Sequence, residues 1–230
     1  MTKPRGPYAK TSAKRRQIID AALAAYAEAG SRKVSVRDIA QRVGMTDAGV
    51  LHHFGGREAL LTAVLAARDE AAAERYGALE ERSAEENLSI LAANASTPGL
   101  VKLFVDLAAA AAEPEHPAHD YFGDRYDRHR RQLAVQLAGA ARAVGPNAEG
   151  PDAAAVGSGA VGTEGPDAEG AGTEARERAA WAARILIAAA DGLQLQWLLD
   201  PRIDMADDIR RLADALLDRP AGRPEDRPVS

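Results

Sequence analysis

The most constraining stretch of the chain is SVRDIAQRVGMTDAGVLHHF, residues 35–54, where small and apolar residues recur at fixed spacings. Ile39 and Val43 lie one helical turn apart, and the small Ala40 beside them lets a second helix approach closely. Gly44 can adopt the positive φ that a tight turn needs, and Val50 can close the small core from the other side. The pattern predicts two short helices that cross at a tight turn.

Polar residues mark where these two helices begin. The Ser35 hydroxyl can cap the first helix, with Asp38 three residues later as a weaker form of the capping box. Thr46 can cap the second helix, which we expect to run to about residue 53. In a helix-turn-helix the second helix lies in the DNA major groove, with its N-terminal residues toward the base edges. The side that we expect to be exposed carries Thr46, Asp47, Gly49, His52 and, as a further candidate, Leu51.

The rest of the chain also predicts helices. Alanine dominates, β-branched and aromatic residues are scarce, and period-2 alternation is absent. An apolar stripe before the helix-turn-helix predicts a first helix that stops near Gly30. Further helices are expected at about 57–75, 84–94, 99–112, 118–143, 176–199 and 204–217. The fold class is therefore all-α.

The formal net charge of -5 hides an uneven distribution. Residues 1–60 hold eleven Lys and Arg against five Asp and Glu, whereas the remaining 170 residues hold 18 basic and 29 acidic residues. A basic head on an acidic body favours a polyanion-binding head and a body with another partner. The alternative is a set of solvated helix faces that differ in sign.

The segment VSVRDIAQRVGMTDAGVLHHFGGREALLTAVL, with its surroundings from about Ser12 to Ala72, resembles the DNA-binding domain of the tetracycline-repressor (TetR) family. The resemblance implies an N-terminal three-helix helix-turn-helix head and a helical domain with an effector cavity and a dimer interface made by the last two long helices. It divides the chain into a basic disordered arm (1–11), a DNA-binding domain (12–72), a regulatory and dimerisation domain (73–217) and a disordered tail (218–230). The residues that carry it best are Gly30, Val36, Ile39, Ala40, Val43, Gly44, Val50, His53, Phe54, Glu58, Ala59, Leu60 and Leu61.

The chain departs from the family pattern at two candidate DNA contacts. Leu51 stands where the family often has tyrosine, and Arg57 stands where it usually has lysine. Arg57 keeps a positive charge that can hold a phosphate at the start of the fourth helix. Asp47 could accept a hydrogen bond from cytosine or favour the positive end of its helix, and we favour the second interpretation. The candidate DNA contacts are Ser35, Arg37, Thr46, Asp47, Gly49, Leu51, His52, His53, Arg57, Arg15 and Arg16.

Basic residues of the N-terminal arm, Lys3, Arg5, Lys10 and Lys14 together with Arg15 and Arg16, fit contacts to the DNA backbone or minor groove. The alternative is a disordered tail that only keeps the protein in solution. This alternative is more plausible for Lys3 and Arg5 than for Arg15 and Arg16.

The last two long helices show apolar faces. In WAARILIAAADGLQLQWLLDP, residues 181–201, apolar residues recur at helical spacing, and IDMADDIRRLADALL follows with a similar stripe. Two such helices per subunit could form a four-helix interface about a two-fold axis. A core helix pair in a monomer is the alternative. The predicted interface residues are Ile185, Ala189, Leu193, Trp197, Ile209 and Leu212.

The scarce large residues of the body are the candidates for an effector pocket, although they could equally fill the core. Among them, burial of the polar His119 or Gln194 would favour ligand recognition. The candidates are Phe104, His119, Tyr121, Phe122, Tyr126, Trp181, Gln194 and Trp197.

Residues 145–173 are rich in Gly, Ala, Pro and acid, and GPNAEG at 145–150 returns as GPDAEG at 165–170. Such a segment buries too little apolar area to offset its ordering entropy, so we expect a disordered insertion.

Other chemistry finds little support in the sequence. The chain has no cysteine, so disulfides and thiolate metal ligands are excluded. His116 and His119 could face one another on a helix, but Pro114 and Pro117 favour a loop or helix start. Motifs for catalysis or nucleotide binding are not seen. We therefore expect no metal, no cofactor and no enzymatic activity.

The sequence thus predicts a ligand-responsive transcription factor: a repressor that binds operator DNA as a homodimer and is released by a small molecule. An activator or architectural DNA-binding protein without inducer is the alternative, and an enzyme on a helical scaffold is a third. Charged residues break the apolar runs, Lys102 and Asp106 in one and Arg184 and Asp191 in the other, so we expect a cytoplasmic protein without a membrane partner.

Overall fold

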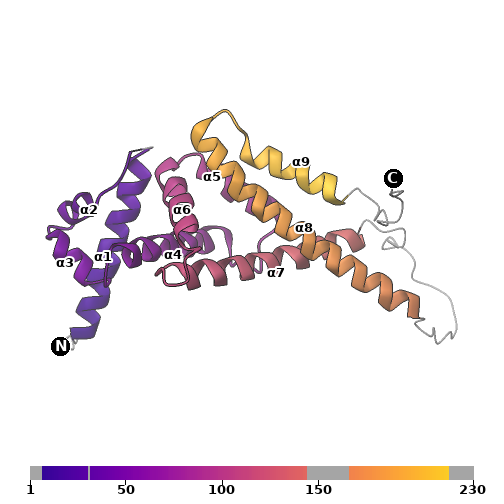
Figure 1. The fold of residues 1–230 in the computed structure, drawn as a ribbon, viewed down its shortest axis with the longest axis horizontal. Coiled ribbons are helices and arrows are strands. Elements are labelled where there is room, and N and C mark those ends of the chain that lie inside the picture. Colours follow the sequence, from indigo (N-terminus) through magenta and orange to yellow (C-terminus); the bar gives the residue numbers. More distant parts are fainter. Residues whose placement is uncertain (1–6, 31, 144–165, 218–230) are drawn as a thin grey trace, which may run out of the picture.

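The computed structural model describes residues 7–30, 32–143 and 166–217, and this part of the chain forms nine α-helices and no strand (Figure 1). The all-α expectation is confirmed. The helices are α1 (Pro7–Glu28), α2 (Val36–Arg42), α3 (Asp47–His52), α4 (Arg57–Tyr76), α5 (Ala84–Asn94), α6 (Pro98–Ala110), α7 (His119–Ala143), α8 (Pro166–Leu199) and α9 (Met205–Leu217).

Helices α1 to α3 form the head at one end of the molecule (Figure 1). Both predicted caps are confirmed: Ser35 and Asp38 form a capping box on α2, and the Thr46 side chain caps α3. Gly44 has a φ of 65°, which lets the chain turn sharply between the two helices. Ile39, Ala40 and Val50 are fully buried between the helices, as the spacing predicts.

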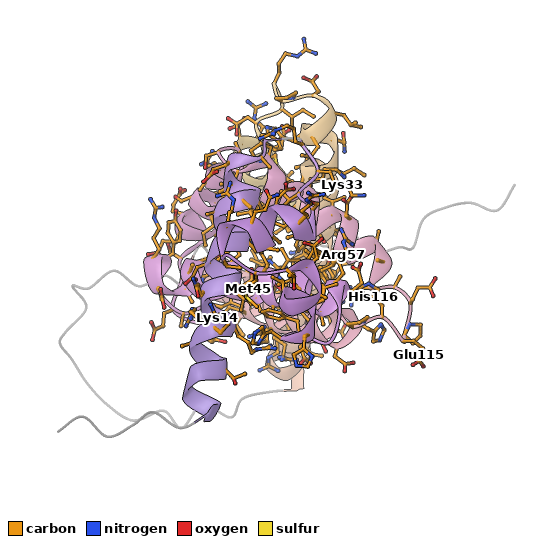
Figure 2. All side chains as sticks on the ribbon, turned by 90° about the vertical axis from the view of Figure 1, so that its left-hand side faces the viewer. Lys14, Lys33, Met45, Arg57, Glu115 and His116 are labelled. Atoms are coloured by element: carbon orange, nitrogen blue, oxygen red, sulfur yellow. The ribbon has the colours of Figure 1, made fainter. Side chains whose placement is uncertain are left out.

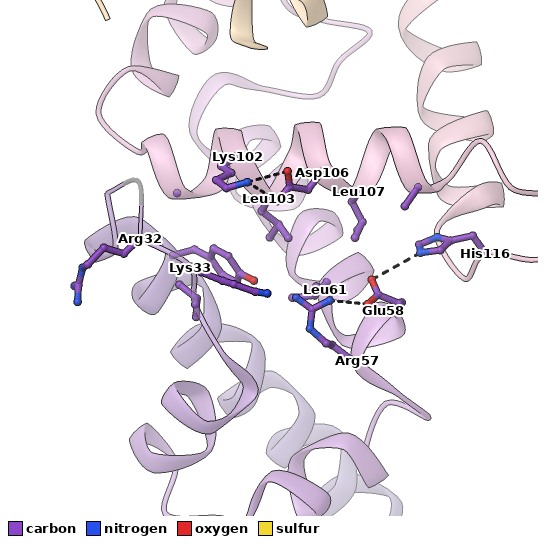
Figure 3. Close-up of a pocket in the computed structure, with 14 residues that line it drawn as sticks. Arg32, Lys33, Arg57, Glu58, Leu61, Lys102, Leu103, Asp106, Leu107 and His116 are labelled. Atoms are coloured by element: carbon purple, nitrogen blue, oxygen red, sulfur yellow. Dashed lines mark hydrogen bonds and ion pairs between the residues drawn. The ribbon is translucent and has the colours of Figure 1, made fainter. Parts of the chain in front are cut away.

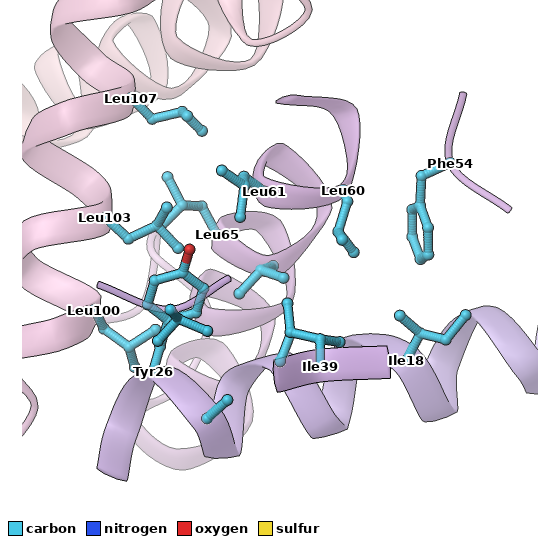
Figure 4. Packing of buried hydrophobic residues seen from close by; sticks show 14 of the residues in the cluster. Ile18, Tyr26, Ile39, Phe54, Leu60, Leu61, Leu65, Leu100, Leu103 and Leu107 are labelled. Atoms are coloured by element: carbon cyan, nitrogen blue, oxygen red, sulfur yellow. The ribbon is translucent and has the colours of Figure 1, made fainter. Parts of the chain in front are cut away.

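A continuous apolar core joins the head to the body. Ile18 and Tyr26 of α1 pack with Leu60, Leu61 and other residues of α4, and the same cluster extends to Leu100, Leu103 and Leu107 of α6 (Figure 4). Helix α4 therefore contacts both the head and the body.

The body is built around a hairpin of the two longest helices, α7 and α8, with α9 folded back along α8 (Figure 1). Leu137, Ala182 and Leu186 pack where α7 meets α8, and the apolar face of α9 covers them. A third cluster brings Trp197 against Leu91 of α5 and Val101 of α6. Helix α8 therefore packs against α5, α6, α7 and α9.

Two predicted boundaries are wrong. Helix α1 begins at Pro7, so residues 7–11 of the predicted disordered arm are helical. Helix α8 begins at Pro166, so residues 166–173 of the predicted disordered insertion are helical too. In both places proline stands in the first turn, where its missing N–H has no intrahelical partner to lose. The rest of the predicted disorder lies outside the described residues: arm residues 1–6, insertion residues 145–165 and tail residues 218–230.

No single helix of the described residues is long and apolar enough to cross a bilayer. Helices α5 and α6 reach that length and composition only as a pair bent by 102°.

Candidate DNA-binding head and buried polar cluster of the body

Helix α3 is held so that one side remains open to solvent. The Thr46 hydroxyl accepts a hydrogen bond from the Gly49 N–H at 3.1 Å, and Val50 anchors the opposite side in the core. Thr46, Asp47 and His52 are exposed, as predicted. Gly49 is half-buried beside the Thr46 hydroxyl. The open side of α3 is therefore a short polar surface with an imidazole at its C-terminal end.

Leu51 is less available than the sequence suggests. It is half-buried and packs against the core cluster of the head. Its apolar side chain therefore helps to hold α3 in place, and only part of it faces solvent.

The start of α2 offers two of the candidate contacts. The Ser35 hydroxyl donates to the Asp38 carboxylate at 2.7 Å and accepts the Asp38 N–H at 3.2 Å. Hydrogen bonds from the Ser35 backbone and side chain hold the pKa of Asp38 below its usual range. Ser35 is therefore committed to the cap, whereas Arg37 is exposed and free to meet a phosphate.

Arg15 has a structural contact that the sequence did not reveal. Its guanidinium donates to the backbone carbonyl of His53 and lies over the Phe54 ring, 4.3 Å from the centroid. Phe54 is buried, as expected, and His53 is half-buried. Arg15 thus fastens the end of α3 to α1, and its contact with DNA stays a prediction.

Arg57 begins α4 directly after Gly55 and Gly56, both of which have positive φ. Its guanidinium pairs with Glu58 at 2.6 Å, yet 44% of its side chain remains exposed. A phosphate at this position would compete with Glu58 for the guanidinium. Figure 2 looks onto this end of the molecule and shows Arg57 with Lys14 and Met45 spread across it.

The basic arm is described only in part. Lys3, Arg5 and the side chain of Lys10 lie outside the described residues. Lys14 bonds to Gln17 at 2.8 Å, and Arg16 lies 3.9 Å from Glu70 with both side chains largely exposed.

In the body, Asp69 of α4 is the centre of a buried polar cluster. It accepts a hydrogen bond from the Tyr121 hydroxyl at 2.8 Å and pairs with Arg125 at 3.0 Å and with Arg68 at 3.2 Å. Burial alone would raise the pKa of Asp69, but Arg125 and Arg68 outweigh it and lower the pKa to about 2. Both guanidinium groups also lie over the ring of Phe104, at 5.3 Å and 5.0 Å from its centroid.

The cluster continues toward α8. The Tyr126 hydroxyl donates to Asp191 at 2.6 Å, and burial raises the pKa of this carboxyl. His129 bonds through Nδ1 to the Arg125 carbonyl at 2.8 Å, and burial together with the positive charge of Arg125 lowers its pKa to about 4. His129 is therefore a neutral imidazole at pH 7, with its proton on Nδ1.

The eight predicted pocket residues separate into three groups. Phe104, Tyr121, Phe122 and Tyr126 meet in the interior around the Asp69 cluster. Gln194 and Trp197 are buried on α8, and Gln194 donates a hydrogen bond to the Ala190 carbonyl at 3.3 Å. His119 and Trp181 are exposed and away from both groups, with His119 Nδ1 hydrogen-bonded to the Ala111 carbonyl at 2.9 Å.

Sequence reasoning missed Asp69, Arg68, Arg125 and Asp191, because charged residues on a helix are usually solvated. The available signal was their position: Asp69 follows the apolar stripe Leu61–Val64–Leu65 by one turn, so it falls on the buried side of α4. Nη1 of Arg68 is buried without a hydrogen-bond partner among the described residues. Such an atom can donate to a polar group that enters the cluster.

The remaining histidine candidates have ordinary contacts. His116 accepts the Ala118 N–H at Nδ1, at 3.1 Å, and its Nε2 lies 3.7 Å from Glu58. Across the described residues, no three His, Asp or Glu side chains converge in a way that could hold a metal ion.

Helices α2 and α3, each capped by a hydroxyl side chain and joined by the tight turn at Gly44, have the geometry of a helix-turn-helix. Residues 18–64 match the sequence model described as "Bacterial regulatory proteins, tetR family". This part of the chain is therefore similar to the DNA-binding domain of TetR-family proteins.

Three known proteins are similar to longer parts of this chain. The chain is 33% identical over 99 residues to the HTH-type transcriptional repressor Rv1474c of Mycobacterium tuberculosis. These 99 residues make up 43% of this chain, and the match covers 43% of the repressor. The match thus spans less than half of the curated relative. A transcriptional regulator of Rhodococcus sp. Rha1 has a similar fold, with a TM-score of 0.54 and 20% identity over 88% of this chain and 93% of that one. The structure of FadR from Bacillus subtilis in complex with stearoyl-CoA is also similar, with a TM-score of 0.50. The two chains are 17% identical in sequence, and the match covers 88% of this chain and 97% of FadR.

Proposed function

We propose that this protein is a ligand-responsive transcriptional repressor that binds operator DNA as a homodimer in the cytoplasm. The observation that carries the proposal is the α3 helix, capped by Thr46 and anchored by Val50, whose polar side is open to solvent. Helices of this kind enter the major groove. Residues 12–72 would act as the DNA-binding domain and residues 73–217 as the regulatory and dimerisation domain.

An apolar stripe on α8 supports the homodimer. Trp181, Ile185, Leu195 and Leu199 are 46%, 37%, 49% and 82% exposed, although large apolar side chains usually avoid solvent. Together with Ala188 and Gly192 they are spaced alternately by four and three residues, the spacing of a helix seam that packs against another helix.

This stripe differs from the predicted interface. Trp197 is buried in the core of the subunit, and Leu193, Ile209 and Leu212 pack partly buried inside it. Ala189 is half-buried, so Ile185 alone of the predicted set belongs to the exposed stripe. Helix α8 is apolar on more than one side, and only the packing of α7 and α9 shows which side stays free. We therefore assign the interface to the exposed stripe.

The buried polar cluster supports an effector site in the body. Aromatic rings and charged groups meet there, and the partnerless Nη1 of Arg68 could donate to an incoming polar group. Arg68 and Asp69 lie on the same helix as Arg57, so a shift of α4 caused by an effector would move the head. A ligand that binds one position of α4 more tightly than the other would change the affinity for operator.

Selection of bound fragments from the organism's own genome by the purified protein tests the function. The bound fragments should share a near-palindromic site with half-site centres one helical turn, about 34–36 Å, or a multiple apart. Bound fragments without any common sequence would contradict it.

Arg57→Ala provides a second measurement. The affinity should fall on all sequences alike, and the slope of log affinity against log salt should decrease by about one. Arg131→Ala, an exposed arginine on α7, is the matched control and should change neither quantity.

A further inference from the structure

A cleft of about 590 Å³ lies where the head meets the body (Figure 3). Its walls are the end of α1 with the residues that follow it, the start of α4, and α6. Its apolar lining comes from Leu61, Leu103 and Leu107. The volume is within the range of sites for small organic ligands. The cleft is separate from the Asp69 cluster of the body.

The cleft carries an excess of positive charge. Arg32, Lys33, Arg57 and Lys102 line it against the two carboxylates of Glu58 and Asp106. Lys102 is neutralised by Asp106 at 2.8 Å and Arg57 by Glu58 at 2.6 Å. Lys33 has no ion-pair partner among the described residues, and Figure 3 shows its side chain extending into the cleft toward Arg57. Two cations that face each other in this way repel unless an anion lies between them.

A neutral donor lies beside these cations. The hydroxyl of Tyr26 is on the cleft wall, within electrostatic reach of Arg57, Asp106 and Glu58, and burial raises its pKa. It has no hydrogen-bond partner in the described part of the chain, so its proton is available to an acceptor. The ring itself is buried, which fixes the position of the hydroxyl.

We infer that this cleft binds a small organic anion with an apolar portion. Its carboxylate or phosphate lies between Lys33 and Arg57 and accepts the Tyr26 hydroxyl, while its apolar portion covers Leu61, Leu103 and Leu107. Charge-assisted hydrogen bonds supply affinity for the anionic group, and burial of apolar surface supplies affinity for the rest. Neither an inorganic anion nor a neutral amphiphile can use both halves of the cleft.

The position of the cleft gives such a ligand a consequence for DNA binding, and this part rests on the proposed function. The ligand would engage Arg57, the proposed phosphate contact, and would press on the segment between α1 and α2. It would therefore compete with the operator for the same guanidinium and lower operator affinity.

Isothermal titration calorimetry without DNA tests the binding site. The probes are octanoate, 1-octanol, which has the chain without the charge, and inorganic phosphate, which has charge without the chain. Octanoate should bind at least about tenfold more tightly than either. Equal affinity for octanoate and octanol, or no octanoate binding, would overturn the inference.

Lys33→Gln locates the bound anion. Lys33 is exposed and makes no contact that the fold requires, so the variant should fold and should bind octanoate about tenfold more weakly. Lys14→Gln, at a half-buried position of α1 that does not line the cleft, should bind octanoate like the natural protein. Octanoate binding that is unchanged in Lys33→Gln would place the ligand elsewhere and refute the assignment.

Operator affinity measured without octanoate and at the octanoate concentration that half-saturates the natural protein separates the two proposals. It should fall for the natural protein and change much less for Lys33→Gln. A protein that binds octanoate in a Lys33-dependent way but selects no DNA sequence would retain the cleft assignment and refute the proposed function. Octanoate binding without any effect on operator affinity would refute the coupling.

Discussion

Gly99 of α6 lies directly against the backbone carbonyl oxygen of Tyr26 in α1: a Cβ atom at position 99 would stand 2.2 Å from that oxygen. The carbonyl oxygen of Gly30 would be 3.0 Å away. Both obstacles are backbone atoms, which cannot rotate aside as a side chain can. The absence of a side chain at position 99 therefore sets how closely the body approaches the head.

Gly99→Ala should force α6 away from α1. We expect a loss of about 2–3 kcal/mol in the free energy of unfolding, typical of an overpacked contact that cannot relax. Chemical denaturation followed by circular dichroism measures it. Gly123→Ala on α7, where a Cβ meets nothing within 4 Å, should instead be neutral or slightly stabilising. Equal stabilities of the two variants would show that the contact does not constrain the fold.

Asp69→Asn should destabilise the body. The carboxylate neutralises Arg68 and Arg125, and its removal leaves both guanidinium groups without their counter-charge, at a cost of about 3 kcal/mol. Since the folded pKa of about 2 lies below the usual value, this contribution is present above pH ~4 and is lost as the pH falls toward 2. Asp214→Asn, exposed on α9, is the matched control. If Asp69→Asn lost no more free energy of unfolding than Asp214→Asn, the cluster would contribute nothing to stability.

His129 should make the protein less stable in mild acid. Its folded pKa of about 4 is below the usual 6.5, so between these values the unfolded chain binds a proton that the folded protein excludes. Stability from this group is complete above pH 6.5 and declines as the pH falls to 4. Denaturation midpoints measured from pH 7.5 to 4.5 should decline less steeply for His129→Gln than for the natural protein. If the midpoints of the two proteins declined in parallel with pH, the lowered pKa of His129 would be contradicted.

Leu195→Asp should dissociate the proposed dimer. The substitution places a charge in the middle of the exposed α8 stripe, where a second copy would have to bury it. Sedimentation velocity should show a monomer for this variant and a dimer for Gln196→Asp, which changes an exposed polar residue next to the stripe. A dimer that survives Leu195→Asp would place the interface elsewhere.

The local features of the head could be predicted from sequence because each depends on residues close together in the chain. The Ser35–Asp38 capping box, the Thr46 cap and the positive φ of Gly44 all arise within three or four residues. The predicted helix at 84–94 coincides with α5 for the same reason, since Ser83 and Glu86 form a capping box at its start.

Contacts between distant segments could not be predicted in this way. Arg15 reaches His53 across 38 positions, and Tyr121 reaches Asp69 across 52. The spacing of apolar residues on α8 was compatible with more than one interface, because the pattern gives no information on which side α7 and α9 cover. The cleft beside Lys33 is likewise lined by residues of α1, α4 and α6, which are far apart in the sequence.

We propose that the exposed side of α3 recognises a DNA sequence, and His52 is the residue with which to test this role. Thr46 is less suitable, because its hydroxyl also caps the helix, whereas His52 is exposed and anchors nothing. The measurement is the ratio of affinities for the selected operator and a scrambled duplex, for the natural protein and for His52→Ala. In His52→Ala this ratio should fall by roughly 5- to 100-fold while the affinity for the scrambled duplex is unchanged. An unchanged ratio, or an equal fall on both duplexes, would contradict it.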